Sequence, residues 1–516
     1  MADGEMLTFD GLIRHWTREK PGQVALEQDG KALTFAALDE RSRRIVAILK
    51  AQGLAKGDRV AWLGKNARLY FELFYSAARM GVVMVPIGWR LAAPEIAYIL
   101  GDTGAKLLFI DEGFAGLAAG ACGDMENPPK VIDTPTAKSD IAAAPADDFE
   151  GAGPDDAVLQ LYTSGTTGNP KGAVLTNANL FALRQPAEEA AQPWSSWDED
   201  EAILVCMPCA HIGGTGLGIM AMAAGVRAIV QAEFTPDGVL DGFEQGITRL
   251  FIVPAALQMV VQHPRAKDTD MSAVKYVMYG AAPIPLDLLR EAVQTIPEAG
   301  FLQCYGMTET TGTIAMLPPE DHTLEGNQRM KSAGKAVPGA ELRVVDEDGE
   351  ELPRGEVGEL ICRSPSNMQG YWNLPDATRG ALKDGWMHTG DAAYMDDDGY
   401  VYIQDRIKDM IISGGENVYP AQVESAIYGH PAVGEVAVIG VPDDIWGEAV
   451  KACVVPRPGS EVDPDDIIAF TRERLAGFKV PKTVDVIEAM PRNASGKILR
   501  RELRAPYWKD HDRQVN

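Results

Sequence analysis

The segment at residues 162–172 combines the side chains and the backbone freedom that suit phosphate chemistry. It contains four Ser and Thr hydroxyls, three glycines and Lys171 within eleven positions. Glycine lets the backbone approach a ligand closely, and hydroxyls, backbone N–H groups and a lysine all donate to phosphate oxygens. The spacing is not that of a P-loop, because the sixth residue counted from Gly165 is Pro170 rather than glycine. The segment therefore predicts that a nucleotide triphosphate is held by a different kind of loop.

This loop resembles the signature loop of the adenylate-forming superfamily, which contains acyl-CoA synthetases, aryl-CoA ligases, luciferases and the adenylation domains of nonribosomal peptide synthetases. Each motif alone is a weak signal, whereas their combination and order are highly specific. The chain is thus identified as a member of the superfamily, most similar to bacterial fatty acyl-CoA synthetases. The further motifs that carry the resemblance lie, in the order of the superfamily, at residues 280–283, 305–309, 386–391, 405–409, 413–420 and 491–498.

The resemblance implies a site for ATP and Mg²⁺. In this site Tyr305 stacks on the adenine, Thr308 contacts phosphate and Glu309 holds Mg²⁺, a hard cation that takes few protein carboxylates. Asp391 binds both ribose hydroxyls, and Arg406 faces the nucleotide. The residues assigned to ATP or AMP are Thr163, Ser164, Gly165, Thr166, Thr167, Gly168, Lys171, Gly280, Ala281, Ala282, Tyr305, Gly306, Asp391 and Arg406. The residues assigned to catalysis are Lys497, His211, Glu309 and Thr308, with Glu309 as the metal ligand.

The resemblance also implies two chemical steps separated by a domain rotation. The substrate carboxylate first attacks the α-phosphate of ATP, pyrophosphate leaves and an acyl-adenylate forms, with Lys497 bridging the two anions. The small domain then rotates about Lys408, and a thiol displaces AMP. CoA is the expected acceptor because few residues follow Tyr507, which leaves no room for a carrier domain. The residues expected at the CoA site are Gly414 and Gly415 beside the pantetheine, Phe478 on the adenine, and Lys479 or Lys482 on the phosphates.

The acid is expected to be apolar. Residues 207–216 resemble the loop that opens and closes the acyl pocket, with His211 as its gate rather than as a general base, and with Gly213 and Gly214 at the pocket floor. Room without a charged lining favours a medium or long chain fatty acid. An aryl or hydroxycinnamic acid is the alternative. An adenylating enzyme that does not use CoA, such as a luciferase-like oxygenase, is less favoured. So is a non-catalytic sensor, because Lys497 and Glu309 are both present.

Composition limits the partners and the location. The chain has 516 residues and a formal net charge of −26, which opposes binding to nucleic acid or to an anionic membrane. Neither a signal peptide nor an apolar run of ~20 residues is found, so we expect a cytoplasmic monomer or homodimer whose partners are a carboxylic acid, ATP and CoA. The pattern Cys206-x-x-Cys209-x-His211 suggests zinc, but a fourth ligand is missing and Cys206 ends an apolar run typical of a buried strand.

The motifs need helices and strands to position them. Residues 31–38 predict a strand that enters a helix, with Thr34 as the N-cap. Residues 70–80 carry apolar side chains at helical spacing, and residues 82–87 follow as an all-apolar strand. Helix followed by buried strand recurs along the chain, which predicts an α/β fold with parallel sheets covered by helices.

The domain organisation follows from changes in this pattern. Residues 1–404 are expected to form a large domain, in which alternation and turn residues over 337–404 predict an antiparallel β subdomain. Residues 405–409 are the expected hinge. Residues 410–516 predict a small mobile α+β domain.

Two charged segments have the composition of solvated surface. Residues 405–409 contain four charges, and Arg500, Arg501 and Arg504 follow Lys497 in a basic C-terminal segment. Side chains of this kind are normally exposed, and from the sequence alone we expect the same here.

Overall fold

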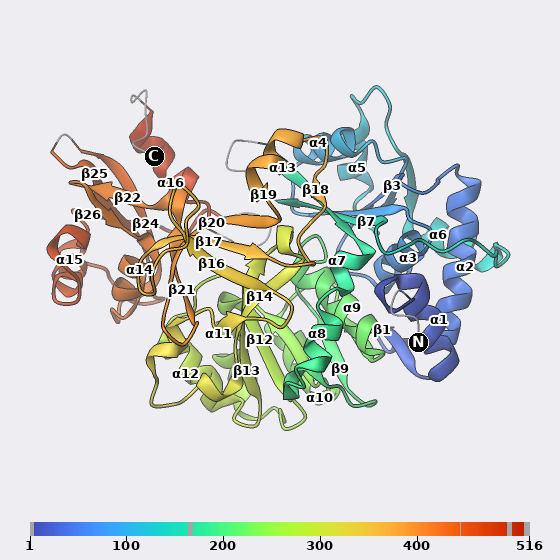
Figure 1. Cartoon of the computed structure of the whole chain (residues 1–516), viewed down its shortest axis with the longest axis horizontal. Coiled ribbons are helices and arrows are strands. Elements are labelled where there is room, and N and C mark those ends of the chain that lie inside the picture. Colours follow the sequence, from blue (N-terminus) through green and yellow to red (C-terminus); the bar gives the residue numbers. More distant parts are fainter. Residues whose placement is uncertain (1–4, 164–168, 444, 493–497, 510–516) are drawn as a thin grey trace. The chain divides into compact units, whose positions relative to one another are not determined.

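The computed structural model describes residues 5–163, 169–443, 445–492 and 498–509 (Figure 1). The chain forms two compact units. The first contains Met1–Ala281, Leu288–Leu342 and Cys362–His388, and the second contains Ala282–Asp287, Arg343–Ile361 and Thr389–Asn516. The hinge at 405–409 and the domain boundary beside it stay predictions.

Two large sheets lie in the first unit. The first has the order β15 (Lys335–Ala336), β14 (Gly312–Leu317), β13 (Gly300–Met307), β12 (Tyr276–Gly280), β11 (Arg249–Ile252), β9 (Ala202–Val205), β10 (Arg227–Val230), β1 (Val24–Gln28), β2 (Lys31–Thr34). The second has the order β18 (Gly370–Tyr371), β8 (Lys171–Thr176), β7 (Ala157–Thr163), β4 (Val83–Ile87), β3 (Arg59–Leu63), β5 (Leu107–Ile110), β6 (Lys130–Asp133). The central strands of both are parallel, as the all-apolar runs predict.

Helices follow the strands of both sheets. They are α1 (Phe9–Glu19), α2 (Phe35–Ala51), α3 (Arg68–Arg79), α4 (Ala93–Thr103), α5 (Ala115–Cys122), α6 (Thr134–Ala143), α7 (Asn177–Phe181), α8 (Arg184–Glu189), α9 (Ile212–Ala224), α10 (Pro236–Glu244), α11 (Pro254–Val261), α12 (Leu286–Thr295) and α13 (Pro375–Ala381). The Thr34 hydroxyl accepts a hydrogen bond from the Ala37 N–H, so the predicted cap of α2 is confirmed. The α/β class is likewise confirmed. Among the described residues, no helix is long and apolar enough to cross a membrane.

Two smaller sheets account for most of the remaining strands. One has the order β16 (Glu341–Val345), β17 (Gly358–Arg363), β20 (Trp386–Met395), β19 (Leu382–Lys383), with β21 (Val401–Arg406) antiparallel to β20. The other has the order β23 (Glu416–Val418), β22 (Ile411–Ser413), β25 (Gly447–Pro456), β24 (Val433–Asp443), with β26 (Thr483–Val486) on β25. The helices α14 (Pro420–Tyr428), α15 (Pro464–Arg472) and α16 (Arg500–Trp508) complete the C-terminal part.

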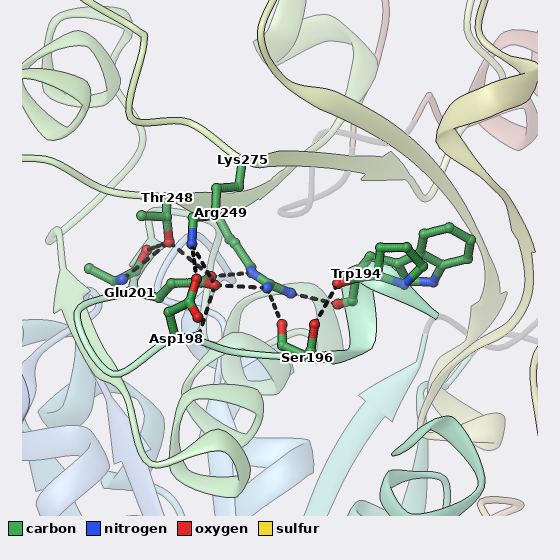
Figure 2. Close-up of polar contacts among 9 residues, drawn as sticks. Trp194, Ser196, Asp198, Glu201, Thr248, Arg249 and Lys275 are labelled. Carbon is green, nitrogen blue, oxygen red and sulfur yellow. Dashed lines mark hydrogen bonds and ion pairs between the residues drawn. The ribbon is translucent and has the colours of Figure 1, made fainter. Parts of the chain in front are cut away.

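Buried charges fix the strand-start edge of the first sheet (Figure 2). Arg249, the first residue of β11, pairs with Glu201 at 2.6 Å, and their side chains are 4% and 2% exposed. The Arg249 guanidinium also donates to the carbonyl oxygens of Trp194 and Ser196 at 2.6 and 2.5 Å. Burial alone would raise the pKa of the Glu201 carboxyl, but the hydrogen bond and the charge of Arg249 hold that pKa below its ordinary value. The cluster therefore joins the loop before β9 to β11 at one end of the sheet.

Candidate active site

The opposite edge of the same sheet, where the parallel strands end, carries most of the predicted site residues of the first unit. His211 follows β9, Gly280 ends β12, and Tyr305 and Gly306 lie in the last turn of β13. The register pairs Gly280 with Cys304, the residue before Tyr305. Ligands of α/β proteins bind outside the carboxyl ends of parallel strands, so this edge has the position expected of a binding site.

Close backbone contacts explain the glycines at this edge. A Cβ atom on Gly280 would lie 2.1 Å from the Cys304 carbonyl oxygen, and one on Gly306 would lie 1.8 Å from the Gly312 carbonyl oxygen. Ala281 adopts a left-handed backbone with φ of +64°. That conformation costs a non-glycine residue roughly 1–2 kcal/mol, and such strain is found preferentially at functional sites.

Glu309 lies at the centre of a hydroxyl-rich cluster. It belongs to the short turn Thr308–Thr310 that joins β13 to β14, and it is only 5% exposed. One oxygen of its carboxylate, Oε1, accepts hydrogen bonds from the Thr163 hydroxyl at 3.2 Å and from the Tyr371 hydroxyl at 2.8 Å. The structure thereby joins Thr163 to Glu309, residues that are 146 positions apart in the chain.

Lys171 lies at the same place. It pairs with Thr163 across the β7–β8 hairpin, and its Nζ atom lies 5.1 Å from the centre of the Tyr371 ring. Tyr371, on β18, is a site residue that the sequence reasoning missed, because no motif spacing connects it to Glu309. The predicted contacts Ser164, Gly165, Thr166, Thr167 and Gly168 lie outside the described residues.

The donor set around Glu309 fits a hard divalent cation. Carboxylate and hydroxyl oxygens are the ligands that Mg²⁺ prefers, together with phosphate oxygens and water. Within the described part of the chain, no three His, Cys, Asp or Glu side chains gather in a way that would hold a metal ion. A cation at Glu309 would therefore take most of its oxygens from a bound nucleotide and from water.

The loop that ends at His211 is held from the core. The Asn66 side chain donates to the Met207 carbonyl oxygen at 3.0 Å and accepts from the Cys209 N–H at 2.8 Å. Thr215 donates its hydroxyl to the Cys209 carbonyl oxygen at 2.6 Å. Asn66 is a supporting residue that the sequence reasoning missed, since it lies on the other large sheet's side of the chain order. The loop is therefore fixed by side-chain to backbone hydrogen bonds.

His211 is the N-cap residue of α9, and burial lowers the pKa of its imidazole to about 4. The ring is therefore neutral at physiological pH. Gly214 follows, and a Cβ atom there would lie 2.3 Å from the Pro208 carbonyl oxygen. Burial also raises the pKa of both thiols in the loop, to about 12 for Cys206, which keeps them protonated. Neutral thiols do not ligate zinc.

One face of α9 presents apolar side chains that the core does not fully cover. Ile212 and Met220 are partly exposed on this face, as is Gly216 between them. Phe251 is partly exposed although it lies in a buried central strand, and its ring is 3.0 Å from the position of a Cβ atom on Gly213. These positions beside His211 form a surface with no charged side chain among them.

The predicted ribose residue belongs to the second unit. Asp391 is opposite Arg406 in the β20–β21 register, and the Asp391 carboxylate accepts from the Arg406 guanidinium at 2.6 Å. Asp391 is 5% exposed. The structure thus brings these two predicted residues together as an ion pair. Ala282 also falls in the second unit.

The predicted CoA residues lie in two turns of the second unit. Gly414 and Gly415 form the turn between β22 and β23, with φ of +63° and +84°, a conformation that favours glycine in tight hairpins. The Gly414 N–H donates to the Trp446 carbonyl oxygen at 2.8 Å. Trp446 is 45% exposed and was missed by the sequence reasoning, since a single Trp in a loop carries no motif. Phe478 is 36% exposed and adjoins Lys479.

Two predicted residues have no described side chain. Lys408 belongs to the turn Ile407–Asp409, but its side chain is not described, and Lys497 lies outside the described residues. Their proposed roles therefore rest on the sequence.

Comparison with known proteins identifies the class. A family model described as "AMP-binding enzyme" matches residues 13–372, and a model of the AMP-binding enzyme C-terminal domain matches residues 422–497. The chain belongs to this family. Within it, the chain is an adenylate-forming ligase of the acyl-CoA synthetase group, as its relatives and its structural neighbours both indicate.

Three relatives cover nearly the whole chain. A fatty acid–[acyl-carrier-protein] ligase, ScoC of Streptomyces coeruleorubidus, is 41% identical over 97% of this chain and 96% of its own length. A feruloyl-CoA synthase of Amycolatopsis sp is 40% identical over 94% and 96%. The long-chain-fatty-acid–CoA ligase FadD13 of Mycobacterium tuberculosis is 38% identical over 92% and 93%.

Solved structures agree with this assignment. A fatty acyl CoA synthetase of Mycobacterium tuberculosis is 35% identical, with a TM-score of 0.77 over 98% of this chain and 99% of the other. ATP-bound MatB from Rhodopseudomonas palustris is 32% identical, with a TM-score of 0.87 over 97% and 99%. The predicted membership and the predicted enzyme class are therefore confirmed.

Proposed function

We propose that this ligase activates a medium or long chain fatty acid with ATP and transfers the acyl group to CoA. The observation that carries the choice of acid is the uncharged surface beside His211, which Ile212, Met220 and Phe251 form on α9 and β11. An apolar surface of this kind stabilises an alkyl chain by about 0.8 kcal/mol for each buried CH₂ group. It offers nothing to pair with a second charge on the acid.

The reaction proceeds in two displacements. A carboxylate oxygen of the acid attacks the α-phosphorus, the bond to the bridging oxygen breaks, and pyrophosphate leaves. The CoA thiolate then attacks the acyl carbonyl carbon, and AMP leaves with the electron pair of the acyl–oxygen bond. Mg²⁺ bound near Glu309 would neutralise phosphate charge during the first displacement.

The chain's own residues position the reactants in this proposal. Asp391 accepts hydrogen bonds from the ribose hydroxyls, and Lys497 neutralises the meeting anions. His211, neutral because of its burial, acts as a wall of the acyl site rather than as a proton acceptor. Thr163 and Lys171 lie next to Glu309 and are assigned to the outer phosphates.

Hydroxycinnamic acids form the second candidate class, because feruloyl-CoA synthases are 40% identical to this chain. The two classes are separated by a panel of acids. Pyrophosphate release is measured with octanoate, palmitate, ferulate, benzoate and acetate, each with and without CoA.

Octanoate or palmitate is expected to give the highest kcat/KM, with release increased by CoA. A preference for ferulate would replace the fatty acid by the aryl class. Release that responds to a holo acyl carrier protein and not to CoA would overturn the acceptor. Absence of release with every acid would overturn the ligase proposal itself.

A further inference from the structure

Opposite charges gather around the first residue of α16. The Arg500 guanidinium donates to both carboxylate oxygens of Glu424 at 2.8 Å, and it lies 3.5 Å from Asp405 and 3.6 Å from Asp409. Its side chain is only 20% exposed. The expectation that this arginine would be an ordinary exposed side chain is therefore wrong. Three carboxylates outweigh the cost of its burial and hold the pKa of Arg500 above its ordinary value.

The three carboxylates come from different elements. Glu424 lies on α14, Asp405 near the end of β21, and Asp409 in the turn after it. In sequence, Asp405 and Asp409 stand on either side of Lys408, the proposed pivot. A rotation about Lys408 would leave Glu424 and Asp409 on the side of Arg500, whereas Asp405 would stay with β21. The contact between Arg500 and Asp405 is therefore the one that such a rotation would break.

Asp405 is unusual for a residue of a charged segment. Its side chain is 5% exposed, so the prediction of a solvated linker is wrong at this position. Its carboxylate accepts hydrogen bonds from the Ala421 N–H and from the Arg406 N–H, each at 2.8 Å. Arg406 in turn pairs with Asp391. The start of α16 is thus linked through Asp405 to the strand that carries the proposed ribose residue.

The same end of α16 adjoins the segment that ends at Lys497. Arg492 pairs with Ile498 in an isolated antiparallel bridge, and the Leu499 N–H donates to the Pro491 carbonyl oxygen at 2.8 Å. These contacts bring together the residues on either side of 493–497 two positions before Arg500. A displacement of Arg500 would be transmitted to this closed base.

We propose that Arg500 is a positioning residue of the adenylation step, which ties the base of the Lys497 segment to Asp405 and so to the strand of Asp391. The pair with Asp405 stabilises the arrangement in which the acid is activated, and it opens when the small domain rotates for thioester formation. This inference rests on the proposed function, because it assumes both half-reactions and the pivot at Lys408.

The test measures the two half-reactions separately in the full-length enzyme. Acyl-adenylate formation is followed by exchange of labelled pyrophosphate into ATP. Thioester formation is followed from a synthetic acyl-adenylate and CoA. The variants are Arg500→Gln and Asp405→Asn, with Arg501→Gln as the matched control, since Arg501 is the exposed neighbour.

Arg500→Gln and Asp405→Asn are expected to lower adenylation by about 10- to 100-fold, the range for a slight misplacement of a catalytic group. Thioester formation should change less than about threefold, as should both half-reactions of Arg501→Gln. Arg500→Lys, which keeps the charge but loses the two-pronged contact, should recover part of the loss.

Equal loss of both half-reactions, or unchanged adenylation, would overturn the positioning role. Asp405→Asn retains the pairs of Arg500 with Glu424 and Asp409, so it keeps the test open if Arg500→Gln fails to fold. Absence of both half-reactions in the unmodified enzyme would instead refute the proposed function, which keeps the two failures distinct.

Discussion

Replacing Asp405 by asparagine is expected to stabilise the protein at neutral pH, although Asp405 forms an ion pair. Burial raises the pKa of this carboxyl to about 6, against the opposing charge of Arg500 and with the help of the nearby Glu424. The ordinary value is 3.8. The folded protein therefore holds the proton more tightly than the unfolded chain does. Stability that is present below the unfolded pKa is lost as the pH rises through about 6.

The size of the effect follows from the shift in pKa. A difference of about 2 units, at 1.36 kcal/mol each, amounts to at most about 3 kcal/mol in the free energy of unfolding. An amide carries no charge at any of these pH values, so the variant lacks this loss. Arg500 keeps its contacts with Glu424 and Asp409 in the variant and is not left without a counter-charge. The stability of Asp405→Asn relative to the unmodified protein should thus increase between pH 4.5 and pH 7.

The assay is urea unfolding followed by tryptophan fluorescence, because Trp446 and Trp508 lie in the same unit as Asp405. Midpoints are compared at pH 4.5, 5.5, 6.5 and 7.5. Asp397→Asn is the control, since Asp397 is exposed in the turn before β21. A difference between Asp405→Asn and the unmodified protein that is independent of pH would refute the reasoning. A variant that becomes less stable as the pH rises would show that the pair with Arg500 outweighs the burial of the carboxylate.

Three further predictions concern the first unit. Glu309→Gln should lower adenylation by about 10²-fold in pyrophosphate exchange and spare thioester formation from a supplied adenylate, because a site for developing phosphate charge loses its anionic ligand; full exchange activity would contradict this role. Arg249→Met should lower the free energy of unfolding by about 3–5 kcal/mol in urea titrations, because it leaves the Glu201 carboxylate buried without its partner; a loss below about 1 kcal/mol would show that the pair is dispensable. Phe251→Ala should shift the ratio of kcat/KM toward the longer of two fatty acids by about tenfold, because the ring borders the acyl surface; an unchanged ratio would place that surface elsewhere.

The sequence predicted local features well because local rules determine them. The Thr34 cap, the helix Pro420–Tyr428 and the buried strand before Cys206 depend on neighbours within a few positions, and each lies where it was expected. The order of motifs was sufficient to identify the family. Contacts that depend on sheet register were out of reach. Tyr371 meets Glu309 only because β18 pairs with β8.

Charged residues were the least predictable part. Composition alone assigns a run of charges to the surface, and it gave the wrong result for Asp405 and Arg500, whose partners are distant in sequence. Three carboxylates from separate elements surround one guanidinium there. No spacing rule along the chain detects such a cluster, since its members are joined only by the tertiary fold.

The two edges of the first sheet divide stability from specificity. Arg249 and Glu201 lock the strands where they begin, whereas the strands end in the His211 loop and in the left-handed Ala281. Substitutions that tune the acid preference thus fall at the end farthest from the contacts that hold the sheet together. Such an arrangement lets mutation explore new substrates with little risk of unfolding, which makes residues 207–220 and Phe251 a rational target for libraries that seek altered acid selectivity.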